Sequence, residues 1–179
     1  KNRGNPDFVL IDIRTPDEFM SGYIEGAVNI NYHDNDFIEK LDKLLNFYSA
    51  ESEISLINGN AGLSGVKVSP DVLRLVDQAL YVSEKTEGSF DITIGPLTSM
   101  YNFHKHIRPD DGKIREKLSL INYGDLLTDN AKSTVYLKRK GMRIDPGGIT
   151  KGYAADRAVE TLKKQGIHAG IVAIAGDIK

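Results

Sequence analysis

The sequence predicts an α+β fold for most of the chain, preceded by the start of an α/β unit. Two observations lead to this class. Beyond about residue 40, long helical patterns of apolar residues are mixed with short strand patterns spaced as a hairpin, which is typical of α+β proteins. The first 35 residues instead contain a strand pattern, a short helix and a second strand pattern, in the order that opens an α/β unit.

The N-terminal elements follow from local patterns. Residues 8–13, FVLIDI, form an apolar run rich in β-formers and predict a buried strand. In the TPDEF stretch that follows, Thr15 caps a short helix and Pro16 fits its first turn, while two acidic residues suit the positive end of the helix. GYIEGAVNI then predicts a turn and a second strand.

Helical spacing returns in the middle of the chain. Apolar positions predict a helix over residues 36–45, with the aspartate at its start as the cap. Residues 52–58 predict irregular structure, and NGNAGLSG predicts a glycine-rich loop. A strong amphipathic helix starts at the Ser-Pro pair at residues 69–70 and ends just before Gly88.

The next elements are shorter. SFDITIGPL predicts an extended segment and a turn, and residues 101–115 predict a polar segment in which RPDDG is a turn or loop tip. REKLSLI, residues 115–121, predicts a short helix. STVYLKR at 133–139 and GMRID at 141–145 predict a hairpin of two strands, joined near residues 140–141. A helix over residues 149–165 and a final buried strand, AGIVAIAGDI, complete the chain.

Composition narrows the function classes. Hydrophobic residues make up 40% of the chain and charged residues 27%, as in a soluble globular protein. A net charge of −2 gives no field that would attract nucleic acid, so no nucleic-acid partner is expected. The sequence has no cysteine, which excludes a disulfide framework, a thiolate zinc site and a cysteine nucleophile. No apolar run approaches the roughly 20 residues of a membrane helix, so a membrane link is expected only through an anchor outside this sequence.

The stretch DPGGITK, residues 145–151, carries the clearest chemistry. Asp145 ends a predicted strand, and the Pro-Gly-Gly that follows forces a turn whose backbone can approach a ligand closely. The next helix presents free N–H groups and a positive dipole end, to which Lys151 adds a charge, and this arrangement suits a phosphate or pyrophosphate. A plain strand-to-helix turn is the competing interpretation, because glycine pairs are common in turns.

Two weaker candidates remain. Phe90 and Asp91 could stack on and hydrogen-bond a heterocycle, although Phe90 taken singly is more typical of a core residue. His104 and His106 alternate and could bind a metal from one face of a strand. Because no third ligand is evident, surface histidines are the favoured interpretation of that pair.

Three ordered stretches together resemble the ApbE family. They are SAESEISLIN, VSPDVLRLVDQALYVSEKTEGSFDITIGPL and RIDPGGITKGYAADRAVETLKKQGI with AGD, and the resemblance runs over residues 41–179. It implies an ApbE-like, T-fold-related domain that is incomplete at its C-terminus, and a magnesium-dependent FAD:protein FMN transferase. Such an enzyme transfers FMN from FAD to a threonine or serine hydroxyl of an acceptor flavoprotein and releases AMP. A non-catalytic FAD-binding fragment and a metal-dependent FAD pyrophosphatase are the alternatives.

The resemblance also implies roles for individual residues, while no catalytic residue is assigned. It places FAD contacts at Tyr48, Ser89, Phe90, Asp91, Asp145 and Lys151. It implies a Mg²⁺ ligand at Gly148, where only the main-chain carbonyl is available. The acidic, hydroxyl and histidine groups that family members carry further on are expected to be absent from this chain, and Mg²⁺ prefers six oxygen ligands. The resemblance favours the bacterial periplasm or the outer face of the cell membrane.

The start of the chain resembles a different family. FVLIDIRTPDEFMSGYIEGAVNI, within residues 5–40, is similar to the opening of a rhodanese domain, whose residues here are mainly structural. The catalytic cysteine of that family has no counterpart in this sequence, so sulfur transfer is not expected. The predicted division is therefore a rhodanese-like fragment over residues 1–40 and an ApbE-like FAD-binding region over residues 41–179.

Overall fold

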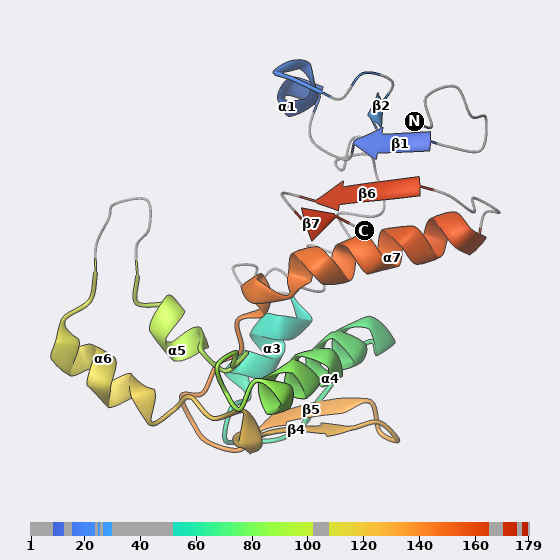
Figure 1. The fold of residues 1–179 in the computed structure, drawn as a ribbon. Coiled ribbons are helices and arrows are strands. Elements are labelled where there is room, and N and C mark those ends of the chain that lie inside the picture. The colour runs from blue at the N-terminus through green and yellow to red at the C-terminus, as the bar shows by residue number, and fades with distance from the viewer. Residues whose placement is uncertain are drawn as a thin grey trace. The chain divides into compact units, whose positions relative to one another are not determined.

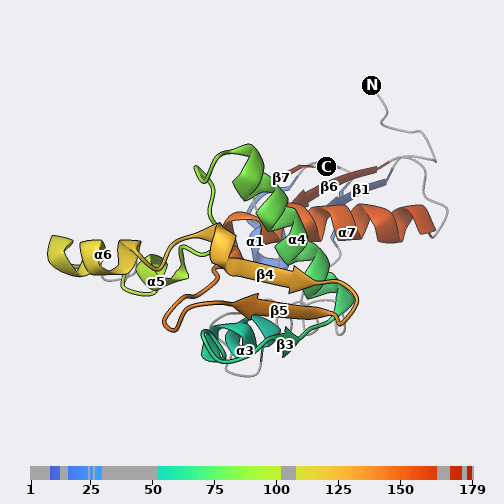
Figure 2. The same ribbon diagram turned by 90° about the horizontal axis from the view of Figure 1, so that it is seen from below.

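A computed structural model shows two compact units (Figures 1 and 2). The discontinuous unit joins residues 1–40 to residues 149–179, and the continuous unit spans residues 41–148. The structure describes residues 9–12, 16–23, 25, 27–29, 52–101, 108–164, 170–174 and 177–178. The helix predicted over residues 36–45 lies outside these ranges.

A four-stranded sheet forms the discontinuous unit, in the order β2-β1-β6-β7. Its strands are β1 (Val9–Asp12), β2 (Ala27–Asn29), β6 (Gly170–Ile174) and β7 (Asp177–Ile178). β1 pairs in parallel with β2 and β6, whereas β7 pairs antiparallel with β6. Helix α1 (Pro16–Met20) connects β1 to β2, and α7 (Thr150–Lys164) packs along β6 and β7 (Figure 1). The N-terminal order of strand, helix and strand is confirmed.

The compact units group the chain differently from the division that resemblance predicts. Residues 149–179 belong to the same unit as residues 1–40, because β6 lies directly beside β1 with Val9 opposite Gly170. The predicted final strand is two short strands, and β6 pairs in parallel with β1 and antiparallel with β7. Packing and family likeness are separate criteria, so the division at residue 40 by likeness remains a prediction.

Two helices and a three-stranded antiparallel sheet make the centre of the continuous unit. The helices are α3 (Glu53–Gly59) and α4 (Pro70–Lys85), and the strands are β3 (Val66–Lys67), β4 (Leu126–Asp129) and β5 (Thr134–Leu137), in the order β3-β5-β4. Both helices pack against the β4–β5 hairpin (Figure 2). Shorter pieces follow the chain: α5 (Gly95–Thr98), α6 (Asp111–Leu118), and the 3-10 turns η1 (Tyr123–Asp125) and η2 (Pro146–Gly148).

Helix α4 confirms the sequence prediction. The Ser69 Oγ accepts a hydrogen bond from the Val72 N–H at 3.3 Å, and Pro70 occupies the first turn, where its missing N–H costs nothing. The Ser69 N–H itself donates to the Glu53 carboxylate at 2.7 Å, which ties the start of α4 to α3. The buried face of α4 consists of Val72, Leu73, Leu75, Val76, Ala79 and Ser83. The helix stops before Gly88, whose φ of +80° favours glycine.

Two helix predictions need correction. Residues 52–58, predicted to be irregular, form most of α3 with its cap: the Ser52 Oγ accepts from the Ser55 N–H at 3.0 Å, and Ile54 and Ile57 are buried. A serine at the cap position, followed by an acidic residue in the first turn, is the capping signal that the prediction overlooked. Helix α6 begins at Asp111 and ends at Leu118, earlier than the predicted range 115–121, because the Asp110 carboxylate caps it through the Gly112 N–H at 2.9 Å.

The predicted hairpin has the wrong partner strand. β5 pairs antiparallel with β4, which precedes it, with Leu126 opposite Leu137 and Asp129 opposite Thr134. The turn at residues 130–133 joins them, and Ser133 takes a φ of +53° there. This pairing buries Leu126 and Leu137 on the same face of the sheet. Residues 141–145 are not the second strand of that hairpin, and they run beside residues 92–94 instead.

Within the part of the chain that the structure describes, no helix combines the length and apolar character that crossing a membrane requires.

Candidate functional site

The strand-like segment at residues 143–145 lies next to residues 92–94. The Asp145 N–H donates to the Ile92 carbonyl at 2.8 Å, and Ile94 forms a parallel bridge with Arg143. Ile92 and Ile144 are buried, so their side chains anchor the two segments in the core. These contacts fix the place from which the chain enters the Pro-Gly-Gly turn.

The Asp145–Gly148 corner is the turn that the sequence singles out. The Asp145 Oδ1 accepts a hydrogen bond from the Gly147 N–H at 2.9 Å, which is an Asx-turn, and η2 completes the corner. Gly147 and Gly148 are exposed, and Asp145 is half-buried. The corner therefore presents main-chain groups to its surroundings while its carboxylate holds the turn.

Phe90 packs against this corner. A Cβ built on Gly148 would lie 3.1 Å from the Phe90 Cε2, so only glycine lets the main chain come this close to the ring without displacing it. Phe90 is half-buried, which leaves part of the ring exposed. The structure thus brings together Phe90 and Gly148, two residues predicted to belong to the site and far apart in sequence.

Changing Gly148 should test that contact. We expect Gly148→Ala to lower the free energy of unfolding by about 1 kcal/mol, because the ring must shift by a few tenths of an ångström. Phe90→Leu removes the ring edge, so adding Gly148→Ala to Phe90→Leu should cost less than adding it to the native chain. Urea unfolding of the four proteins measures this coupling. Additive costs would show that the alanine meets no resistance from the ring.

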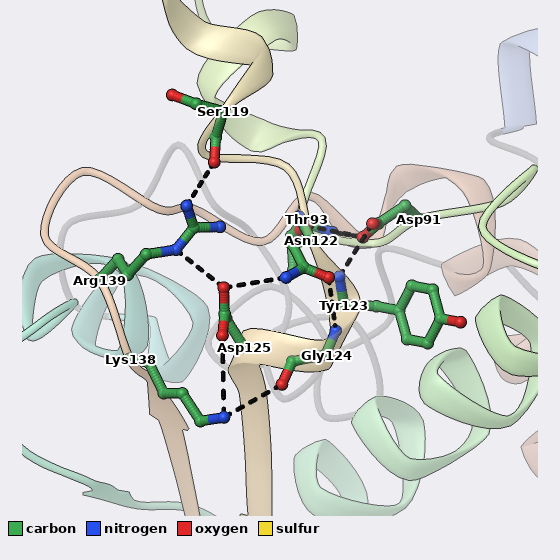
Figure 3. Close-up of polar contacts among 9 residues, drawn as sticks. All are labelled: Asp91, Thr93, Ser119, Asn122, Tyr123, Gly124, Asp125, Lys138 and Arg139. Carbon is green, nitrogen blue, oxygen red and sulfur yellow. Dashed lines mark hydrogen bonds and ion pairs between the residues drawn. The ribbon is translucent and has the colours of Figure 1, made fainter.

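Asp91 holds the segment that carries Phe90 (Figure 3). Its Oδ1 accepts from the Thr93 N–H at 2.8 Å and from the Thr93 hydroxyl at 2.7 Å, and its Oδ2 accepts from the Tyr123 N–H at 2.9 Å. The Thr93 Oγ1 in turn accepts from the Asn122 N–H at 2.9 Å. Asp91 therefore binds this segment to η1, and a direct contact of its carboxylate with FAD remains a prediction.

A second polar cluster fastens η1 to the end of β5 (Figure 3). The Asp125 Oδ2 lies 2.8 Å from the Arg139 Nε and accepts from the Asn122 Nδ2 at 3.0 Å, and the Lys138 Nζ donates to the Gly124 carbonyl at 3.3 Å. Arg139 also donates to the Ser119 carbonyl after α6. The sequence analysis did not identify Thr93 or Asn122, although the D-x-T spacing of Asp91 and Thr93 is a local signal for such a turn.

The structure gives less information on the other predicted site residues. Ser89 is exposed, and its N–H donates to the Thr86 carbonyl at 2.9 Å. Lys151 is exposed in the first turn of α7 and belongs to the discontinuous unit. Tyr48, His104 and His106 lie outside the described residues. The described ranges contain no group of three or more histidine, aspartate or glutamate side chains that could hold a metal ion.

The fold and the sequence both match those of known proteins. Its mixed helix-and-sheet fold is that of flavin transferases of known structure: the flavin transferase ApbE from Vibrio cholerae superposes with a TM-score of 0.71 at 26% identity, over 79% of this chain and 46% of that one. The ApbE protein from Thermotoga maritima gives a TM-score of 0.67 at 30% identity, over 76% of this chain and 45% of that one. A sequence model described as the ApbE family matches residues 13–179. The chain belongs to the ApbE family.

Curated relatives carry one functional name. A FAD:protein FMN transferase of Klebsiella pneumoniae (strain 342) is 34% identical over 143 residues, which are 79% of this chain and 45% of that protein. A FAD:protein FMN transferase of Treponema pallidum (strain Nichols) is 26% identical over 148 residues, 79% of this chain and 41% of that protein. The chain thus spans less than half the length of these relatives. The family match begins at residue 13, within the segment predicted to be rhodanese-like, and the rhodanese likeness remains a prediction.

Proposed function

We propose that this chain forms the FAD-binding part of a FAD:protein FMN transferase. The observation that carries the proposal is the packing of the Phe90 ring against Gly148, in a corner whose main chain is held by the Asp145 carboxylate. A flavin dinucleotide offers a pyrophosphate for such a corner and flat rings for an aromatic side chain. The relatives named FAD:protein FMN transferase support the same substrate.

The proposed reaction joins FMN to an acceptor flavoprotein. A threonine or serine hydroxyl of the acceptor attacks the FMN phosphorus and loses its proton. The bond between that phosphorus and the bridging oxygen breaks, and AMP leaves with that oxygen. Phosphoryl transfer depends mainly on positioning and charge stabilisation, so the residues of this chain would act by binding and orienting FAD. We assign Phe90 and Asp145 to that binding role and propose Lys151 from the family resemblance alone, while Asp91 orients Phe90.

Magnesium is part of the proposal only through Gly148, whose carbonyl would be one ligand. Mg²⁺ is usually bound through one or two carboxylates as well as waters and substrate phosphates. Within the described ranges no acidic or histidine cluster surrounds that carbonyl, so the described residues alone do not fit a magnesium site. We therefore propose no step of the reaction that involves the ion. From the family resemblance we also propose a location in the bacterial periplasm or on the outer face of the cell membrane.

FAD titration tests the proposal. FAD, FMN and AMP are added separately to the chain, with and without Mg²⁺, and flavin fluorescence or calorimetry reports binding. FAD should bind more tightly than either half. An acceptor protein with a candidate threonine is then added, and flavin that survives denaturation shows transfer. Bound but unreacted FAD would mean a non-catalytic binding fragment, and release of FMN and AMP would mean a pyrophosphatase. Absence of FAD binding would contradict the proposal.

The charge of Asp145 provides a sharper test. Asp145→Asn keeps an oxygen for the Gly147 N–H but removes the negative charge. We expect FAD affinity to fall by about tenfold, because a charge-assisted hydrogen bond to the substrate is lost. The free energy of unfolding measured in urea should change little. Asp129→Asn, on the β4–β5 hairpin and paired with Lys132 at 3.1 Å, is the matched control and should leave FAD affinity unchanged. Equal affinities for the two variants would remove Asp145 from the proposed site.

A further inference from the structure

We infer that Asn58 is a positioning residue for the Asp145–Gly148 corner, and this inference rests on the proposed FAD-binding function of that corner. Asn58 lies in the last turn of α3, 86 positions before Ile144. Its Oδ1 accepts from the Ile144 N–H at 2.7 Å, and its Nδ2 donates to the Ile144 carbonyl at 3.1 Å. One side-chain amide thus satisfies both main-chain groups of a single distant residue.

These two hydrogen bonds take the place of those that a neighbouring strand would make to Ile144. In an extended chain the N–H and C=O of one residue point to one side and those of the next residue point to the other, and the groups on each side need partners when the chain is buried. On one side of residues 143–145, the Asp145 N–H donates to the Ile92 carbonyl. On the other side, Asn58 provides the donor and the acceptor for Ile144. The segment that leads into the corner is therefore held from both sides.

Asn58 is itself well anchored. Ile54 and Ile57, which lie on the same short helix, are fully buried or nearly so, with 0% and 1% of their surfaces exposed. The Ser52 cap fixes the start of α3, and the Glu53 carboxylate accepts from the Ser69 N–H at the start of α4. α3 also packs against β5. Because Asn58 is anchored in this way, its side chain can hold the main chain of Ile144 at a fixed position relative to the core.

The consequence concerns the geometry of the site. Asp145 follows Ile144 directly, and its carboxylate fixes the Gly147 N–H. Gly148 then meets the Phe90 ring, whose own segment is fixed by Asp91. A loss of the Asn58 amide would release the corner on one side while leaving the Phe90 side intact. The Asn58 side chain makes its hydrogen bonds to the main chain of Ile144, so the role that we infer is to orient Asp145 and Gly148.

A simpler role would be stability alone, in which Asn58 only satisfies buried groups of Ile144. The two roles differ in which residues lose protection when the Asn58 amide is removed. If the amide only stabilises the fold, its loss exposes the Ile144 N–H to exchange and goes no further. If it positions the corner, its loss also frees the Gly147 N–H, three residues on, and weakens FAD binding by the folded protein.

Asn58→Leu in the full chain tests this, because leucine has a similar size and makes neither hydrogen bond. Asn60→Leu is the matched control, because Asn60 caps the same helix and its Nδ2 donates to a carbonyl within that helix, that of Leu56, at 2.9 Å. Urea unfolding curves first show that each variant is folded in the absence of urea. Amide hydrogen exchange at Ile144 and Gly147 is then measured without urea, and FAD affinity is measured by fluorescence under the same conditions. Asn58→Asp, which keeps an acceptor for the Ile144 N–H, replaces Asn58→Leu if the latter does not fold.

We expect Asn58→Leu to speed exchange at Gly147 by at least about tenfold and to weaken FAD binding by about tenfold, with neither change in Asn60→Leu. Faster exchange at Ile144 alone, with Gly147 and FAD affinity unchanged, would overturn the inference. If the native chain binds no FAD, the proposed function fails separately, and Gly147 exchange then decides the positioning role by itself: unchanged exchange refutes it, and faster exchange supports it.

Discussion

Asp91→Ala is expected to lower the free energy of unfolding by about 3 kcal/mol or more, the largest effect of any single change considered for this protein. The alanine removes the acceptor for the Thr93 N–H, the Thr93 hydroxyl and the Tyr123 N–H. Thr93 is fully buried, with 0% of its surface exposed, so its donors would be left without water as well as without a partner. Buried donors that lose their acceptor cost about 1–3 kcal/mol each.

The measurement is urea unfolding, with the midpoint and slope compared between variants. Asp110→Ala is the matched control, since that exposed aspartate makes one similar bond, to the Gly112 N–H at the start of α6. Its loss should cost about 1 kcal/mol, as for other helix caps. FAD affinity adds a second readout, because the segment carrying Phe90 should lose its attachment to η1. Similar losses of unfolding free energy in the two variants would mean that the hydrogen bonds of Asp91 contribute no more to stability than one exposed helix cap.

Gly95→Ala should be the second most damaging change, with a cost of about 2 kcal/mol. A Cβ at this position would lie 2.7 Å from both the Cβ and the main-chain oxygen of Arg143 and 2.9 Å from its carbonyl carbon. Because two of these atoms belong to the main chain, no rotamer change can relieve the overlap. The two segments must separate, which strains the Asp145–Ile92 hydrogen bond beside them.

Gly59→Ala is the control for this change, since a Cβ on Gly59 meets nothing within 4 Å at the end of α3. That alanine should be neutral or stabilise the protein by up to about 1 kcal/mol. Urea unfolding measures both variants, and FAD titration shows whether separating the segments also disturbs the corner. A Gly95→Ala protein as stable as Gly59→Ala would contradict the close approach of residues 95 and 143.

Several features could be predicted because their causes lie within a few residues. Ser69, Pro70 and the apolar spacing that follows define α4 with little help from the rest of the chain. The same holds for α7, which begins within a residue of the predicted position. Family likeness identified Asp145, Gly148 and Phe90 as site candidates, and the structure places Phe90 against Gly148. The FAD contacts themselves remain predictions.

Tertiary structure alone decided which segments meet. The apolar alternation of β5 fits a partner on either side in sequence, and pairing with β4 won because it places Leu126 and Leu137 on one buried face. Asn58 shows no local sign of its role, since its partner Ile144 lies 86 positions away. Asp91 likewise reaches Tyr123 across 32 positions. Local sequence determined the helices and their caps, because capping and periodicity act over a few residues; pairing and side-chain clamps depend on folding that brings distant main-chain groups together.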